Sequence, residues 1–91
     1  SSTDNAHIVI LPAAVAGTVV YLNSEGEASQ AYELRSASPA AVAINGGTGS
    51  NAESAIAAGT ALVRCVCVAN DKWICTQYAN DGTEAKVEAA A

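Results

Sequence analysis

Short apolar runs separated by turn-forming residues recur along the chain, and this pattern predicts β-strands. Residues 7–11 form a β-branched run that stops at Pro12, and residues 17–23 form a second run that ends at the turn residues Asn23-Ser24-Glu25-Gly26. Residues 31–35 alternate apolar and charged side chains, with Tyr32 and Leu34 in one set. This alternation predicts a third strand with one face in solvent.

The middle of the chain is less regular. Pro39 interrupts it, residues 41–44 form a short apolar piece, and residues 45–51 read Asn-Gly-Gly-Thr-Gly-Ser-Asn, which predicts a flexible turn or loop. Residues 52–58 fit two structures, because Glu53 and the alanines favour one helical turn whereas Ile56 is the centre of a possible short strand. The sequence leaves both alternatives open.

Residues 59–78 give the strongest local signal, because two β-type runs flank Asn70-Asp71 and so predict a β-hairpin. The tail that follows, residues 83–91, has a helix-favouring composition, but so short an isolated helix must dock on something or fray. We therefore expect an all-β fold, a small β-sandwich or β-barrel-like domain that ends in a hairpin at 60–78, with flexible arms at both ends. The expected boundaries are an N-terminal arm at 1–6, a β-domain at 7–80 and a C-terminal tail at 81–91.

Composition limits the size of the core. The chain has 91 residues, enough for one small domain, and much of its 51% hydrophobic content is alanine, with no Phe or Met and one Trp. Such a core is modest, and small scaffolds of this kind gain support from disulfides, metals or oligomerisation. We expect a homo-oligomer.

The charge balance excludes some partners. The net charge is −5, and the four basic residues are scattered rather than gathered into a stripe, so direct binding to nucleic acid is not expected. No apolar run approaches the roughly 18 residues that a membrane span needs, and no secretion signal is present. A start at Ser1-Ser2 without any Met fits a complete small protein that lost its initiator methionine, and a processed precursor would look the same.

No grouping of residues predicts catalysis or a cofactor. His7 is the single histidine, no Gly-x-Ser-x-Gly motif accompanies it, and the glycine-rich residues 46–50 lack the Lys of a phosphate-binding loop. We therefore expect no enzyme activity, no catalytic residue, no cofactor and no metal. The acidic residues near the turns and the tail are expected to be a solvated face rather than a cation site: Glu25, Glu27, Asp71, Asp81, Glu84 and Glu88.

The three cysteines lie in the predicted hairpin, and the turn decides which of them meet. With a two-residue turn at Asn70-Asp71, Val66 faces Cys75, while Cys65 and Cys67 lie on the opposite face, so that no pair can bond. A three-residue turn instead places Cys67 opposite Cys75. We favour the first register and three buried, reduced thiols, as in a cytosolic product. Zinc is disfavoured because Cys-x-Cys lacks the usual ligand spacing.

Four segments, taken in order, resemble a pattern found in small β-rich virion proteins of tailed bacteriophages. They are residues 8–20 (strand, Leu-Pro, small residues, Gly, strand), the turn Ile44-Asn45-Gly46, the Ala-Gly strand start at 57–61, and Asp71-Lys72-Trp73 after the last turn. Head-decoration (cement) proteins and domains of tail fibres both carry such β-modules.

The resemblance implies a mechanical role. A decoration protein binds the outer face of the assembled capsid, often as a trimer, so the expected partners are the major capsid protein and further copies of this chain, and the expected location is the virion exterior. One terminal arm, residues 1–7 or 83–91, is expected to contribute to these contacts. The alternative is a receptor- or glycan-binding module of a tail fibre, with Trp73, Tyr21, Tyr32 and Tyr78 gathered on an exposed surface. A third alternative is a non-viral β-sandwich interaction domain.

Overall fold

The computed structural model describes residues 8–23 and 32–91, so the expectations for the N-terminal arm, for His7 and for the turn after Asn23 lie outside the described residues. Every regular element in the described ranges is a β-strand, which confirms the predicted all-β fold. The bounds are β1 Ile8–Ile10, β2 Val19–Asn23, β3 Tyr32–Arg35, β4 Ala43–Ile44, β5 Ser54–Ile56, β6 Thr60–Ala69, β7 Lys72–Ala79 and β8 Glu84–Lys86. No helix of these ranges is long and apolar enough to cross a membrane.

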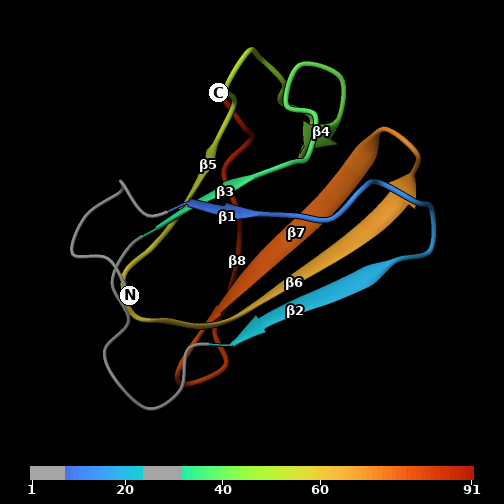
Figure 1. Ribbon diagram of the computed structural model, residues 1–91. Helices are drawn as coiled ribbons and strands as arrows, with labels where there is room; N and C mark the ends of the chain where they lie inside the picture. Colours follow the sequence, from blue (N-terminus) through green and yellow to red (C-terminus); the bar gives the residue numbers. More distant parts are fainter. Residues whose placement is uncertain (1–7, 24–31) are drawn as a thin grey trace.

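The strands form two sheets packed as a small sandwich, one of the two expected forms (Figure 1). One sheet has the order β1-β3-β5, and the other has the order β2-β6-β7, with β4 and β8 both paired to the free edge of β7. The pairs β1/β3 and β4/β7 are parallel, and the remaining pairs are antiparallel. Residues 54–56 are a strand rather than a helical turn, because pairing with β3 places Ile56 in the core.

The hairpin is present with the predicted two-residue turn, but its register differs from the favoured one. Ala69 pairs with Lys72, whereas Cys67 pairs with Trp73 and Cys65 with Cys75, so Val68 is an extra residue on β6. A β-bulge of this kind reverses the facing of every later residue relative to an uninterrupted ladder. The prediction that the cysteines divide between the two faces is therefore wrong, and the alternative pairing of Cys67 with Cys75 is not observed either.

The core lies between the sheets and is built mainly from aliphatic side chains and cysteines around Trp73. Trp73 is fully buried, and all three cysteines point into the same core as free thiols. The prediction that all three thiols are buried is thus confirmed. The buried apolar residues are Leu11, Tyr32, Leu34, Ile44, Ala52, Ile56, Val63, Cys65, Cys67, Trp73, Cys75, Val87 and Ala90.

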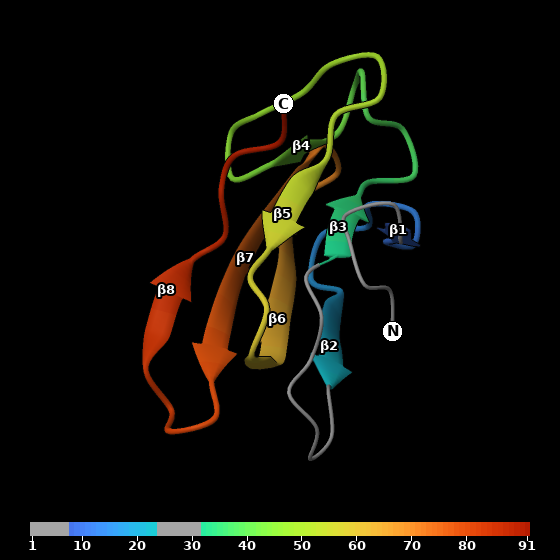
Figure 2. The same cartoon turned by 90° about the vertical axis from the view of Figure 1, so that its left-hand side faces the viewer.

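The C-terminal residues dock on the domain, in contrast to the flexible tail that was expected. After β8 the chain buries Val87 and Ala90, and the Ala90 N–H donates to the Ile44 carbonyl at 3.2 Å. Ala91 then exchanges two backbone hydrogen bonds with Glu53, beside β5. Figure 2 shows this segment rising from β8 to the end of the molecule that carries β4 and the start of β5. The tail has no helix because its edge position offers β7 as a ladder partner, whereas a helix would have to form alone.

Candidate functional site

Four of the seven exposed large hydrophobic side chains in the described residues lie on the side of the larger sheet that faces away from the core. Strand register places three cross-strand rows there: Val19, Val66 and Ile74; Tyr21, Arg64 and Thr76; Asn23, Leu62 and Tyr78. Val68, the bulged residue, extends this side beyond the first row. We call these residues the outer face. Tyr21 is 60% exposed, Val68 52%, Ile74 48% and Val19 46%.

The outer face was missed in the sequence, although a signal was present. The run from Leu62 to Val68 is apolar at nearly every position, not only at alternate ones. Continuous apolar runs are typical of strands that are covered on both faces. In this structure β6 is covered by the core on one side and by nothing in the described chain on the other.

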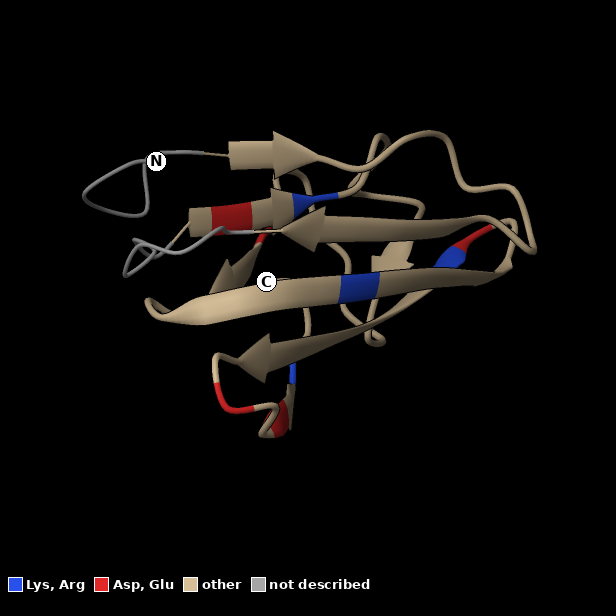
Figure 3. Ribbon diagram, turned by 90° about the horizontal axis from the view of Figure 1, so that it is seen from below, with Lys and Arg blue, Asp and Glu red and all other residues tan. Residues whose placement is uncertain are grey.

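Arg64 is the one charged residue of the outer face, and the outward positions that border it on β7 and β8 carry more basic than acidic residues even though the chain is acidic. The outward positions of β6, β7 and β8 include four exposed charged residues: Arg64, Lys72, Glu84 and Lys86. Three of these charges are positive and one is negative, a sum of +2. The whole chain has a net charge of −5. Figure 3 shows how few charged positions the strands carry, with acidic positions in the smaller sheet, in turns and on β8. The outer face therefore favours a partner surface that is apolar and acidic.

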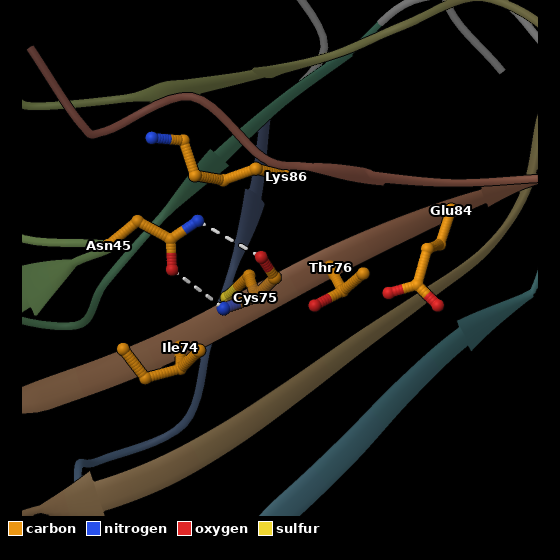
Figure 4. A pocket seen from close by; sticks show the side chains of 6 residues that line it. All are labelled: Asn45, Ile74, Cys75, Thr76, Glu84 and Lys86. Carbon is orange, nitrogen blue, oxygen red and sulfur yellow. Dashed lines mark hydrogen bonds between the residues drawn. The ribbon is translucent and has the colours of Figure 1, made fainter.

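A shallow pocket of about 340 Å³ opens at one edge of the outer face, where β4 and β8 separate along β7. It is lined by Asn45, Ile74, Cys75, Thr76, Glu84 and Lys86 (Figure 4). Glu84 and Lys86 supply opposite charges to its rim, and the Asn45 amide reaches toward β7 from the other side.

A tight turn positions Asn45, and the residues Ile44-Asn45-Gly46 predict this turn. Asn45 has φ 49° and Gly46 has φ 91°, and Ile44 and Gly47 exchange backbone hydrogen bonds of 3.1 and 3.0 Å. Positive φ at both central residues defines a type I′ turn, for which Asn-Gly is the preferred pair. The segment expected as a flexible loop thus begins with a fixed turn.

The Asn45 side chain then completes the ladder along β7. Its Oδ1 accepts from the Cys75 N–H at 2.8 Å, and its Nδ2 donates to the Cys75 carbonyl at 3.0 Å and to the Val87 carbonyl at 2.6 Å. The amide occupies the gap between β4 and β8, where no backbone pairs with Cys75 N–H. This pocket wall is therefore structural.

Carboxylates gather on the smaller sheet, but they are already engaged. Glu53 forms a salt bridge with Arg35, and the Glu88 carboxylate accepts from the Ala55 N–H at 2.9 Å. Glu33 alternates with the core residues Tyr32 and Leu34, as expected, but it lies in the central strand and is 9% exposed, so the expectation that it faces solvent is wrong. Burial, with the neighbouring Glu53 and Glu88, raises the pKa of Glu33.

The other predicted candidates do not assemble into a site. Asp71, Asp81, Glu84 and Glu88 are exposed, as expected for a solvated face, and Glu25 and Glu27 lie outside the described residues. Across 8–23 and 32–91, no group of three or more His, Cys, Asp or Glu residues is placed to hold a metal ion.

The four aromatic residues do not gather on a surface. Trp73 and Tyr32 are buried at 0% and 9% exposure, Tyr78 is half-buried, and Tyr21 projects from β2. The expected aromatic platform for a sugar is therefore wrong for this structure.

Comparison of the chain with models of protein families, with curated proteins and with solved structures found no match.

Proposed function

We propose that this protein is a structural binding module that docks through its outer face, and that it acts as a decoration protein on the exterior of a bacteriophage capsid. The observation that carries the proposal is the outer face itself, whose adjacent cross-strand rows combine exposed and half-buried apolar side chains; the exposed ones are Val19, Tyr21, Val68 and Ile74. Single exposed apolar residues are ordinary, but contiguous ones mark surfaces that bind other proteins. The resemblance of the chain to small phage virion proteins supplies the specific form.

The chemistry of the outer face defines the partner. Apolar rows with a basic surplus fit a protein surface that is apolar at its centre and acidic at its rim. In this proposal the partner is the major capsid protein, and further copies of the chain complete a homotrimer. The acidic remainder of the domain faces solvent and keeps the assembled particles apart.

Decoration is favoured over the tail-fibre alternative by the placement of the aromatic residues. A glycan platform needs aromatic rings in the open, and Trp73 and Tyr32 are used in the core instead. The outer face is mainly aliphatic and charged, and Tyr21 and Tyr78 are its aromatic residues, a mixture that suits a protein partner.

The test compares native mass and capsid occupancy for three proteins. The wild-type chain is expected to have the mass of a trimer and to bind shells assembled from the capsid protein of the phage that encodes it. Ile74→Lys places a charge in the first row of the outer face, and we expect it to lower occupancy at least about tenfold, the effect of about 1.4 kcal/mol. Val15→Lys is the matched control, because Val15 is 59% exposed but lies in the connector between β1 and β2.

Fluorescence of the buried Trp73 reports whether both variants are folded. Arg64→Glu, in the second row, should weaken binding most at low salt, because screening reduces the contribution of an exposed charge. Equal occupancy of wild-type and Ile74→Lys, or absence of binding by the wild-type chain, would refute the proposal.

A further inference from the structure

Cys65 on β6 and Cys75 on β7 are direct cross-strand partners, and their backbone groups show which kind of pair they form. The Cys75 N–H and carbonyl both bond to the Asn45 side chain, so they point away from β6. On β6, the Cys67 N–H donates to the Thr18 carbonyl at 2.8 Å, toward β2, and the groups of Cys65, two residues earlier, point the same way. Cys65 and Cys75 are thus a non-hydrogen-bonded pair, whose Cα atoms lie about 4.5 Å apart in antiparallel sheets.

That spacing falls within the range that a disulfide spans, about 4.4–6.8 Å between Cα atoms. The two thiols already share a hydrogen bond, and both are buried, at 0% and 1% exposure. Tyr32, from the opposite sheet, lies near Cys65. Burial raises the pKa of the Tyr32 hydroxyl to about 12, and the charge of a Cys65 thiolate contributes to this rise.

Cys67 is excluded from the pair by position and by its own contact. It pairs with Trp73, and it is diagonal to Cys75, a relation that separates Cα atoms by about 7–8 Å. Its Sγ donates to the Ala69 carbonyl at 3.0 Å, so it is turned toward the bulge at Val68.

We propose that Cys65 and Cys75 are a site of covalent oxidation, at which a small disulfide such as oxidised glutathione converts the two thiols to an intramolecular disulfide and leaves Cys67 free. The Cys65 thiolate attacks one sulfur of oxidised glutathione, the glutathione S–S bond breaks, and a mixed disulfide and one glutathione thiolate result. The Cys75 thiolate then attacks the Cys65 sulfur and displaces the second glutathione. The protein loses two electrons and two protons, and one oxidised glutathione becomes two reduced ones.

The order of attack follows from the shared hydrogen bond. The bond from the Cys75 thiol lowers the pKa of Cys65, and the same bond, with burial, raises the pKa of Cys75. Cys65 therefore ionises first. Because neither sulfur is exposed, the first attack requires the two sheets to part, so oxidation of the folded protein is slow compared with that of an exposed thiol.

The disulfide would fix the hairpin beneath the outer face. The neighbouring pair, Val66 and Ile74, belongs to the first row of that face. Closing the short loop between Cys65 and Cys75 restricts the unfolded chain, and we expect the melting temperature to rise by roughly 10 °C.

The first experiment identifies the bridge in the wild-type chain. The protein is refolded in a buffer of oxidised and reduced glutathione, free thiols are alkylated, and the product is digested with trypsin. Cleavage after Arg64, Lys72 and Lys86 yields peptides 65–72 and 73–86, which hold two cysteines and one cysteine respectively. We expect a linked pair of these peptides and one alkylated thiol, and before alkylation an intact mass lower by about 2 Da than that of the reduced protein.

Three alanine variants then assign the partners. Oxidised Cys67→Ala should retain the linked peptides and the rise in melting temperature, and it should show no free thiol. Cys65→Ala and Cys75→Ala should each remain reduced, with two free thiols and no rise. A bridge that includes Cys67, or a wild-type chain that stays reduced on refolding in this buffer, overturns the proposal.

Discussion

Replacement of Asn45 by glycine is expected to destabilise the domain strongly, although the residue lies next to a glycine-rich loop. Glycine accepts the positive φ of this position without strain, so the substitution removes the side-chain amide and leaves the type I′ turn feasible. What is lost is the set of three hydrogen bonds to Cys75 and Val87.

The magnitude follows from what those three bonds leave behind. The Cys75 carbonyl keeps the Val87 N–H, at 3.4 Å, but the Cys75 N–H has no other bond among the described residues. A net hydrogen bond contributes about 1 kcal/mol, and a buried donor without a partner costs about 1–3 kcal/mol. We therefore expect a loss of about 3 kcal/mol, a large share of the roughly 5–15 kcal/mol that stabilises a small domain.

Urea unfolding followed by Trp73 fluorescence measures this loss, because Trp73 is the single tryptophan and is buried. Ser50→Gly, in the exposed part of the same loop, is the control for the greater freedom that glycine gives the unfolded chain. Asn45→Asp should be at least as destabilising as glycine, because its second carboxylate oxygen, which can only accept, would face the Cys75 and Val87 carbonyl oxygens in place of the donor. A difference below about 1 kcal/mol between Asn45→Gly and Ser50→Gly would refute the reasoning.

Three further outcomes are expected. Gly47→Ala should cost at least about 2 kcal/mol and expose the C-terminus to carboxypeptidase, because a Cβ at Gly47 would overlap the Ala90 backbone, whereas Gly49→Ala, which meets one side chain at 3.6 Å, should be nearly neutral. The wild type should lose stability as the pH rises from about 4.3 through the raised pKa of Glu33, because the folded protein favours the protonated carboxyl. Glu33→Gln should not show this loss when urea midpoints are measured against pH. Tyr32→Phe should likewise flatten the fall in stability between about pH 10 and 12, since the folded protein holds the pKa of Tyr32 at about 12; parallel curves for wild type and variant would contradict either pH prediction.

The strands were predictable from the sequence because local chemistry determines each of them. Pro12 ends the first apolar run, Asn70-Asp71 forms the hairpin turn, and Asn45-Gly46 fits a type I′ turn that few other dipeptides can adopt. The edges of these elements follow from residue types within a few positions of one another.

The docking of the C-terminus was not predictable from local chemistry. Residues 83–91 have the composition of a weak helix, and what places Val87 in the core is a vacancy at the edge of β7 together with the approach of Gly47 to Ala90. Both conditions depend on residues about 10–45 positions away in the chain, so no window of sequence contains them. The role of the Asn45 side chain, whose amide replaces a backbone hydrogen-bond partner of β7, was unpredictable for the same reason.

The bulge at Val68 explains why the outer face and the thiol pair occur together. Without it, Trp73 would point away from the core and Ile74 would point inward. A buried Trp removes about 150–250 Å² from water, more than an Ile does. At about 25 cal/mol per Å², burying Trp73 in place of Ile74 stabilises the bulged register by more free energy than one unpaired residue costs. That register turns Cys75 inward onto Cys65, leaves Ile74 exposed and leaves Val66 half-buried on the outer face. The double exchange Trp73→Ile with Ile74→Trp moves the tryptophan by one position and should therefore remove the preference for the bulge. Cys65 and Cys75 would then no longer be paired. We expect this variant to form no disulfide with oxidised glutathione and to lack the apolar first row of the outer face.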